Sequence, residues 1–293
     1  MSELLSIFPS IRENEILAPY TTFRVGGTAR YFLIIKNRED LKKALEIAKE
    51  ESLPVFILGG GSNVLVSSKG FPGLVIKNEM NMLRVEDSKI TAESGTVLAL
   101  VVKAAKDNGL IGIAALHGVP GTFGGAVRGN AGVPNCEMGS FVVSAILLDE
   151  NLEFKTVDQE YFQYAYRYSR LKENREIIIE ATIELTPGGN PQEIFAEMQE
   201  MLKSRKAKQP WGSSGGSYFK NPTKEYSAGF VVDQVGGKGS RVGGAQISEK
   251  HANFMINAGG ATSDDIKNLA SEMKRKVKEK FGVELHEEVE FIE

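Results

Sequence analysis

The sequence predicts a protein of the α+β class with two or three domains. Three observations carry this prediction: a length of 293 residues, an alternation of strand-like and helix-like segments up to about residue 76, and a strand-dominated stretch after it. A hydrophobic content of 42% is enough for a substantial core. We expect a first lobe over residues 1–78, a second lobe over 79–190, and a C-terminal α/β domain over 195–293 whose terminal strand packs back on the first part.

The first lobe is predicted from three consecutive segments. Residues 31–35 are apolar and aromatic, which indicates a strand, and residues 54–58 indicate another. Between them, residues 39–51 place Leu41, Ala44, Leu45 and Ala48 on one helical face. These segments form a small α/β unit.

The second lobe is predicted to consist mainly of strands. After a last strand-like segment of the first lobe at 74–76, residues 89–92, 145–148 and 177–185 are strand-like, and a helix is expected from about residue 97 until Gly109 stops it. The Pro-Gly-Gly cluster at 187–189 then interrupts regular structure. It is expected to be a joint between two parts of the chain.

The C-terminal part is predicted to begin and end with regular elements. Asn190 can cap a helix that has Pro191 in its first turn. Thr262 and Asp265 have the spacing of a capping box, and Gly282 is placed to end the helix that follows. A terminal strand is expected over 283–292.

Composition and charge exclude several classes of function. A net charge of −3 provides no overall positive field for nucleic acid or an anionic membrane surface. Cys136 is the only cysteine, so an intrachain disulfide is impossible, and the three histidines are too scattered to suggest a local metal motif. No segment approaches the ~20 apolar residues of a membrane span. We expect a cytoplasmic protein with small-molecule partners and no metal.

Two glycine clusters indicate that the backbone closely approaches a ligand. Residues 118–132, GVPGTFGGAVRGNAG, contain six glycines, and residues 59–61 are three glycines that follow an apolar run. Glycine loses more conformational entropy on folding than other residues, so such density suggests positive φ or close backbone approach. Consecutive amides in these turns can bind an anion such as phosphate.

The glycine clusters do not fit two common nucleotide motifs. Val64 occupies the third glycine position of a dinucleotide fingerprint that begins at Gly59, and Lys238 lacks the glycine that a phosphate-binding loop needs six residues before the lysine. Any phosphate site is therefore of another type. Tight turns without a ligand are the alternative, and two dense clusters make it less favoured.

Several strings resemble one known family in the same order and spacing. They are TTFRVGGTARYF (21–32), LGGGSNVLVSSKGFPGLVI (58–76), the block at 118–132, YRYSR (166–170), GSYFKNP (216–222), AGFVVDQVGGKGSRVGGAQISEKHANFMIN (228–257) and LHEEVEFI (285–292). Together they resemble the UDP-N-acetylenolpyruvoylglucosamine reductase (MurB) family over nearly the whole chain. Only about 35 residues separate Arg170 from Arg205, and a strand, turn and helix use them, so the chain resembles the shorter, second type that lacks a tyrosine-bearing loop.

The resemblance implies a fold, a reaction and cofactors. Its FAD-binding part has two lobes of the PCMH type, as in vanillyl-alcohol oxidase-like flavoproteins, and a separate domain binds a UDP-sugar. The implied activity is that of a UDP-N-acetylmuramate dehydrogenase: reduction of UDP-N-acetyl-3-O-(1-carboxyvinyl)-glucosamine to UDP-N-acetylmuramate for peptidoglycan, with non-covalent FAD and with NADPH as hydride donor. We expect a monomer.

The resemblance also implies which residues form the site. The FAD-binding residues are expected to be Gly59, Gly60, Gly61, Ser62, Asn63, Val119, Pro120, Gly121, Thr122, Gly124, Gly125 and Ala126. Arg167 is expected to stabilise the substrate carboxylate, because a guanidinium binds carboxylates in a bidentate manner. Ser217 is expected to be the proton donor and Glu288 to orient or polarise the same region. The expected substrate-binding residues are Arg205, Lys208, Lys220 and Asn221.

Each of these residues has an ordinary structural alternative. Taken alone, Arg167 fits a surface stacking residue, Ser217 a turn hydroxyl and Glu288 a solvated charge; their convergence in one family pattern favours the functional interpretation. Arg205 and Lys208 fit equally well as cations that compensate a helix end. Two other functions stay open: an oxidase for small alcohols on the same flavin fold, and a non-catalytic protein that binds sugar nucleotides.

Overall fold

The computed structural model describes residues 3–293, which divide into two compact units. The first unit consists of the residues up to Ile11, of Leu33–Gly60 and of Leu74–Ser204. The second consists of Arg12–Phe32, Gly61–Gly73 and Arg205–Glu293. Three elements have residues in both units: β2 (Thr28–Ile35), β5 (Phe71–Asn78) and α5 (Pro191–Lys208).

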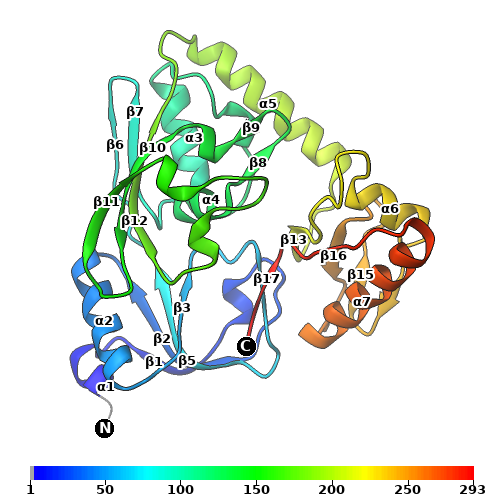
Figure 1. The fold of residues 1–293 in the computed structure, drawn as a ribbon, viewed down its shortest axis with the longest axis horizontal. Helices are drawn as coiled ribbons and strands as arrows, with labels where there is room; N and C mark the ends of the chain where they lie inside the picture. The colour runs from blue at the N-terminus through cyan, green and yellow to red at the C-terminus, as the bar shows by residue number, and fades with distance from the viewer. Residues whose placement is uncertain (1–2) are drawn as a thin grey trace. The chain divides into compact units, whose positions relative to one another are not determined.

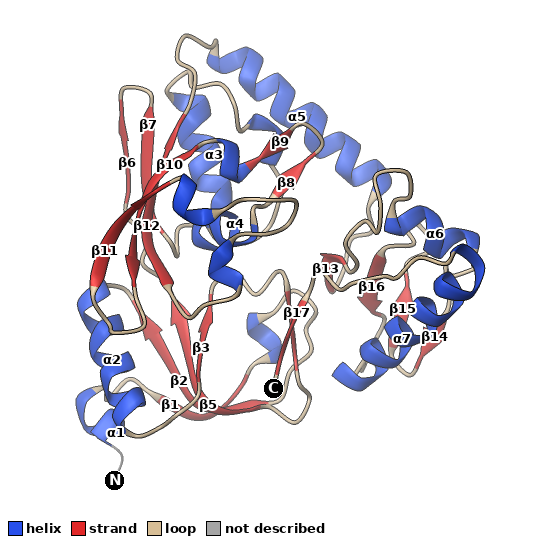
Figure 2. Ribbon diagram, viewed as in Figure 1, coloured by secondary structure: helices blue, strands red, loops and turns tan. Residues whose placement is uncertain are grey.

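The remaining helices and strands belong to one unit each (Figures 1 and 2). Those of the first unit are α1 (Glu3–Ile7), α2 (Arg38–Glu50), β3 (Val55–Leu58), β6 (Leu83–Glu86), β7 (Lys89–Glu93), α3 (Leu98–Asp107), α4 (Phe123–Gly129), β8 (Gly132–Val133), β9 (Cys136–Glu137), β10 (Val142–Leu148), β11 (Phe154–Asp158) and β12 (Ile177–Glu184). Those of the second unit are β1 (Arg12–Ile16), β4 (Val64–Val66), β13 (Ser214–Ser217), α6 (Ala228–Gln234), β14 (Arg241–Val242), β15 (Ala245–Ile247), β16 (Phe254–Asn257), α7 (Ser263–Phe281) and β17 (Glu290–Ile292).

A five-stranded sheet in the order β11-β10-β12-β7-β6 forms the centre of the first unit. Adjacent strands in this sheet are antiparallel, and the register places Ala181 of β12 between Ala145 of β10 and Ala92 of β7. Helix α3 packs against β7, and α4 packs against β7 and β12, as Figure 2 shows. The small side chains at this register leave room for helices to pack closely on the sheet.

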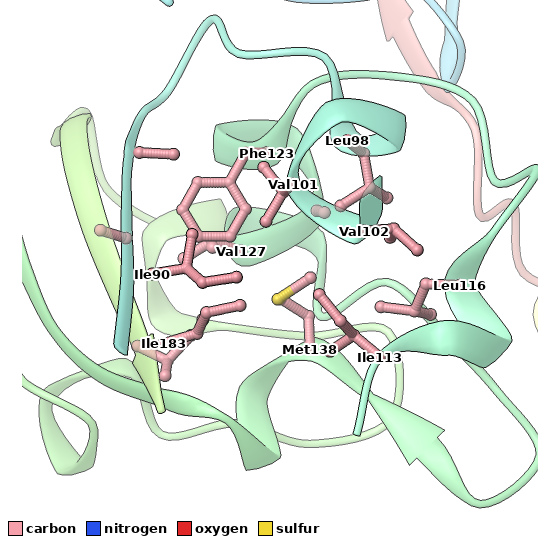
Figure 3. Close-up of a cluster of buried hydrophobic side chains, with 14 of the residues drawn as sticks. Ile90, Leu98, Val101, Val102, Ile113, Leu116, Phe123, Val127, Met138 and Ile183 are labelled. Carbon is pink, nitrogen blue, oxygen red and sulfur yellow. The ribbon is translucent and has the colours of Figure 1, made fainter. Parts of the chain in front are cut away.

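The core of the first unit includes part of the long glycine block. Phe123, the first residue of α4, is fully buried, and its ring lies among Ile90, Val101 and Val127 in Figure 3. Burial of a phenylalanine contributes roughly 1.5–3 kcal/mol. Phe123 therefore anchors the glycine residues that flank it in the chain.

A four-stranded sheet has the order β1-β2-β5-β3. Strands β1 and β2 are antiparallel, with Glu13 opposite Tyr31. Strands β3 and β5 are parallel, with Leu58 opposite Lys77. Residue 58 is the last of its strand, so the first glycine turn begins beside Lys77.

The second unit has its own sheet and core. The sheet order is β13-β16-β15-β14 with antiparallel neighbours, α7 packs against β14 and β15, and α6 packs against α7. Phe23, Val25 and Leu65 are buried in the same core as the apolar face of α7. Strand β17 pairs in parallel with β4, which joins residues 290–292 to residues 64–66. This unit is thus assembled from segments far apart in the sequence.

Most predicted elements are present, and one is mostly wrong. The capping box of Thr262 and Asp265 is formed, Gly282 ends α7 with φ +68°, and the Asn190 Oδ1 accepts a hydrogen bond from the Gln192 amide at 2.9 Å. The strand expected over 283–292 is reduced to residues 290–292. Before it, Glu287 forms only an isolated bridge with Phe219. The reason is that the segment pairs first with the residues around Phe219 and then with β4. Among the helices of residues 3–293, none is long and apolar enough to cross a membrane.

Candidate functional site

The two glycine clusters meet within the first unit, backbone against backbone. A Cβ added to Gly60 would lie 2.6 Å from the Gly121 Cα, and one added to Gly59 would lie 2.7 Å from the Thr122 Oγ1. Contacts this short leave no room for a side chain, so both positions require glycine for close approach rather than for positive φ. Gly60 is exposed, and the turns therefore meet at the surface of the unit.

The amides at this meeting point keep their donor capacity. Among the backbone hydrogen bonds of residues 3–293, none is donated by the amides of Gly60, Gly121 or Thr122. Buried or half-buried amides are normally paired, so the open donors of Gly121 and Thr122, beside the exposed amide of Gly60, are typical of an anion site. The residues at this point fit the phosphate groups of a dinucleotide.

The residues after Thr122 are held by the protein itself. The Thr122 side chain caps α4 by accepting from the Gly125 amide at 3.3 Å, and the Gly124 amide donates to the Ser94 carbonyl at 2.9 Å. Gly124 is buried, and a Cβ there would lie 2.4 Å from the Ser94 Cβ. Gly124 thus allows close packing of α4, and Ala126 is also buried. Before Gly121, Val119 is half-buried and Pro120 exposed.

The last three residues of the first glycine turn belong to the second unit. Gly61 has φ +64°, and a Cβ there would lie 2.0 Å from the Tyr20 carbonyl oxygen, so glycine is required. Ser62 is half-buried. Asn63 Nδ2 donates to the Glu288 carbonyl at 3.0 Å, and the Glu290 amide donates to the Asn63 carbonyl at 3.0 Å. This turn is therefore tied to the segment that carries Glu288.

Ser217 and Glu288 lie on neighbouring segments of the second unit. Ser217 is the last residue of β13, and the carbonyl of the next residue, Tyr218, accepts from the Glu288 amide at 2.8 Å. Two residues further, the Lys220 amide donates to the His286 carbonyl at 2.8 Å. The side chains of Ser217 and Glu288 are half-buried. Two residues that are distant in sequence are thus held side by side by backbone bonds.

Asn253 fastens the Ser217 segment and was not among the predicted site residues. Its carbonyl accepts from the Tyr218 amide at 2.8 Å, its Oδ1 accepts from the Phe219 amide at 3.0 Å, and its Nδ2 donates to the Phe219 carbonyl at 2.9 Å. Its side chain is only 3% exposed. A buried side-chain amide that both donates and accepts hydrogen bonds in this way fixes the backbone that directly follows Ser217.

Arg167 belongs to the first unit and has an unusual backbone conformation. Its φ is +54°, which is uncommon for a residue other than glycine. The guanidinium donates to the Gly132 carbonyl at 2.7 Å and lies over the Tyr166 ring, 5.1 Å from its centroid. The neighbouring Ser169 is fully buried, and its hydroxyl donates to the Arg128 carbonyl at 2.5 Å. The YRYS segment is therefore attached to the end of the glycine block.

The four predicted substrate-binding residues differ in their surroundings. Arg205 is half-buried at the end of α5, and burial lowers the pKa of its guanidinium, whereas Lys208 is exposed. Lys220 is half-buried. Asn221 is exposed, and its Oδ1 accepts from the Ala228 amide at 3.0 Å, which holds the start of α6. Their roles toward a substrate stay predictions.

Lys77 is a residue at the first glycine turn that sequence reasoning did not single out. Its Nζ donates to the carbonyl of Gly59, the first residue of the glycine turn. The available signal was a lysine at the end of the apolar run 74–76, but its importance depends on the parallel pairing of β3 with β5.

Replacement of Tyr164 by phenylalanine is expected to stabilise the protein. The Tyr164 hydroxyl is buried and makes no hydrogen bond with residues 3–293, and burial raises its pKa. An unsatisfied buried polar group costs about 1–3 kcal/mol, so we expect the free energy of unfolding to rise by about 1 kcal/mol in urea denaturation. Tyr161→Phe is the matched control with the opposite sign, because the Tyr161 hydroxyl donates to Glu176 at 2.8 Å. A loss of stability in Tyr164→Phe would contradict this account.

Comparison with known proteins first defines the class of protein. Residues 29–155 match the family described as an FAD binding domain, and the structure of a berberine bridge enzyme variant has a similar fold, with a TM-score of 0.52 at 19% identity over 64% of this chain and 44% of that one. The fold is thus the α+β fold of PCMH-type FAD-binding proteins, as predicted. Together with the paired glycine turns, it defines the chain as an FAD-binding protein.

More similar relatives then define the family. Residues 207–292 match the C-terminal domain of UDP-N-acetylenolpyruvoylglucosamine reductase. Proteins of that name from Clostridium novyi and Caldanaerobacter subterraneus are 39% and 40% identical, over 96% and 95% of this chain and 92% of each relative. The crystal structure of the reductase from Thermus caldophilus has a TM-score of 0.81 at 35% identity and covers 97% of this chain and 100% of that one. The chain belongs to the UDP-N-acetylenolpyruvoylglucosamine reductase family.

Proposed function

We propose that the protein reduces UDP-N-acetyl-3-O-(1-carboxyvinyl)-glucosamine to UDP-N-acetylmuramate, a precursor of peptidoglycan, with NADPH as the reductant. The observation that carries the proposal is the backbone pairing of the Ser217 segment with the Glu288 segment, which brings a residue with a hydroxyl and a residue with a carboxylate onto neighbouring segments. Family membership over nearly the whole chain supports the same reaction.

The glycine turns hold the cofactor in this proposal. The open amides of Gly60, Gly121 and Thr122 donate to the diphosphate of non-covalently bound FAD. When bound, FAD supplies the redox chemistry that links NADPH to the enolpyruvyl double bond. The missing side chains at these positions let the backbone reach the phosphate oxygens.

Three polar residues handle the charge and the proton of the substrate. Hydride arrives at C3 of the enolpyruvyl group, so negative charge develops at C2 and in the adjoining carboxylate. Arg167 binds that carboxylate, since a guanidinium is permanently charged and forms paired hydrogen bonds. Ser217 delivers the proton to C2, and Glu288 orients the same region. Because a serine hydroxyl is a weak acid, Lys220 or water connected to it assists the transfer.

The substrate nucleotide is bound by the remaining predicted residues. Arg205 and Lys208 face the two phosphates, and Asn221 contacts the diphosphate or uridine region. The half-burial of Arg205 supports this assignment, because partial desolvation strengthens the attraction between a cation and a phosphate. The protein is expected to be a monomer in the cytoplasm. The two FAD-binding lobes are expected over 1–78 and 79–190, and the domain that binds the UDP-sugar over 195–293.

Anaerobic reduction tests the proposed function. The purified protein is expected to show flavin absorption that NADPH bleaches and that UDP-N-acetyl-3-O-(1-carboxyvinyl)-glucosamine restores. UDP-N-acetylglucosamine, which lacks the double bond, is the matched control and is expected to restore nothing. Reoxidation by oxygen alone, unaffected by the enolpyruvyl substrate, would favour an alcohol oxidase. Binding of the UDP-sugar without bleaching would favour a non-catalytic binding protein.

A further inference from the structure

Lys77 is a half-buried cation at the first glycine turn. Its side chain extends from β5 to the Gly59 carbonyl, to which Nζ donates. Among the ion pairs within residues 3–293, none includes Lys77. A cation that is partly removed from water usually has an anionic partner. The charge of Glu79 acts on Lys77 without forming an ion pair with it, so the position leaves room for an anion supplied from outside the chain.

The bonded carbonyl shares its peptide unit with an open amide. The carbonyl of Gly59 and the N–H of Gly60 belong to one peptide, and residues 3–293 contain no cis peptide bond. In a planar trans peptide these two groups point in opposite directions. A lysine that holds the Gly59 carbonyl on one side thus presents the Gly60 N–H on the other. The neighbour of Gly60 is Gly121, so this N–H lies at the meeting point of the two turns.

The charge of Lys77 also changes the strength of this donor. A cation bonded to a carbonyl polarises the peptide and makes its N–H a better donor. Burial lowers the pKa of the Lys77 ammonium, and the charge of Glu79 opposes this effect. A bound anion would favour the charged form of Lys77 in the same way. The hydrogen bond from Lys77 orients the Gly60 N–H, and the charge of Lys77 makes this N–H a better donor. Both effects therefore favour the binding of an anion.

We propose that Lys77 is a positioning residue for the dinucleotide diphosphate: it fixes the Gly59–Gly60 peptide and supplies positive charge behind the open amides. This inference rests on the proposed binding of FAD by the glycine turns. Lys77 acts through the peptide and not by direct contact with the phosphates. Its substitution should therefore weaken the binding of ligands that contain the diphosphate and spare the binding of flavins that lack it.

The test compares two flavins on the apoprotein. FAD and riboflavin, which has no phosphate, are titrated into the unmodified chain, Lys77→Met and Lys77→Arg, and binding is followed by flavin fluorescence. We expect Lys77→Met to weaken FAD about 10- to 100-fold, the usual value of a charge-assisted hydrogen bond, and to leave riboflavin within about 2-fold. Lys77→Arg keeps the charge and the donor and is expected to retain most of the affinity. Lys106→Met, a half-buried lysine paired with Asp107, is the matched control.

The possible outcomes separate this inference from the proposed function. Unchanged FAD affinity in Lys77→Met, or equal weakening of both flavins, would overturn the inference alone. An unmodified chain that binds no FAD would overturn the proposed function and the inference with it. If thermal unfolding shows that Lys77→Met does not fold, Lys77→Gln replaces it. Glutamine keeps a donor for the Gly59 carbonyl without the charge, and the same difference between FAD and riboflavin is expected.

Discussion

Replacement of Ser217 by alanine is expected to slow turnover of the enolpyruvyl substrate by about 10²–10⁴-fold, the usual contribution of a positioned proton donor. Reduction of the enzyme by NADPH is expected to continue at the unmodified rate, because that half of the reaction needs no proton at C2. The two rates are measured separately by stopped-flow absorbance. The split between them is what identifies a proton donor.

The fold around Ser217 makes this substitution interpretable. The backbone that follows Ser217 is held by hydrogen bonds with Asn253 and with the Glu288 amide. Neither set of hydrogen bonds involves the serine hydroxyl. Ser214→Ala is the matched control in the same strand, since the Ser214 Oγ accepts from the Gly216 amide at 3.2 Å. Equal slowing of both half-reactions, or full activity, would assign the proton to another group.

Replacement of Gly60 by alanine is expected to weaken FAD binding by about 10- to 100-fold. The added Cβ would lie 2.6 Å from the Gly121 Cα, and a backbone atom cannot move aside as a side chain can. Overpacking of this kind costs about 1–3 kcal/mol, and each 1.4 kcal/mol corresponds to about tenfold in affinity. Flavin content after purification and fluorescence titration both measure the effect.

Gly129 provides the control for this experiment. It lies at the end of α4, a Cβ there would meet nothing within 4 Å, and neither Gly60 nor Gly129 has positive φ. Both substitutions therefore change chain entropy alike and differ in steric conflict. Gly129→Ala is expected to keep normal FAD affinity. Normal affinity in Gly60→Ala as well would show that the two turns do not form the diphosphate site.

Local patterns in the sequence predicted local structure well. The capping box at Thr262, the cap at Asn190 and the strand that leads into Gly59 are all determined by residues within a few positions of one another. The strand predicted over 283–292 failed for a related reason. Its apolar pattern is real, but the segment pairs first with residues around Phe219 and then with β4, which a local pattern cannot reveal.

The candidate site was predicted mainly through family resemblance. The glycine clusters pointed to a phosphate on physical grounds, whereas Arg167, Ser217 and Glu288 were chosen because they match family motifs. Lys77 was missed because its importance arises from a pairing between strands: Leu58 lies opposite Lys77, which brings the lysine to the glycine turn. Nonlocal registers of this kind are not contained in the periodicity of either strand.

The assembly of the second unit from three separate segments affects how the chain can be cut and how it folds during synthesis. Phe23, Val25 and Leu65 fill the core beneath α7, and β17 needs β4 as its partner. A fragment of residues 205–293 would therefore expose apolar surface and lose a strand partner. On the ribosome, β1 and β2 can pair as soon as both have been made. In contrast, β4 and the core residues Phe23, Val25 and Leu65 are made long before β17 and α7, and stay without these partners until residues 263–292 have been synthesised.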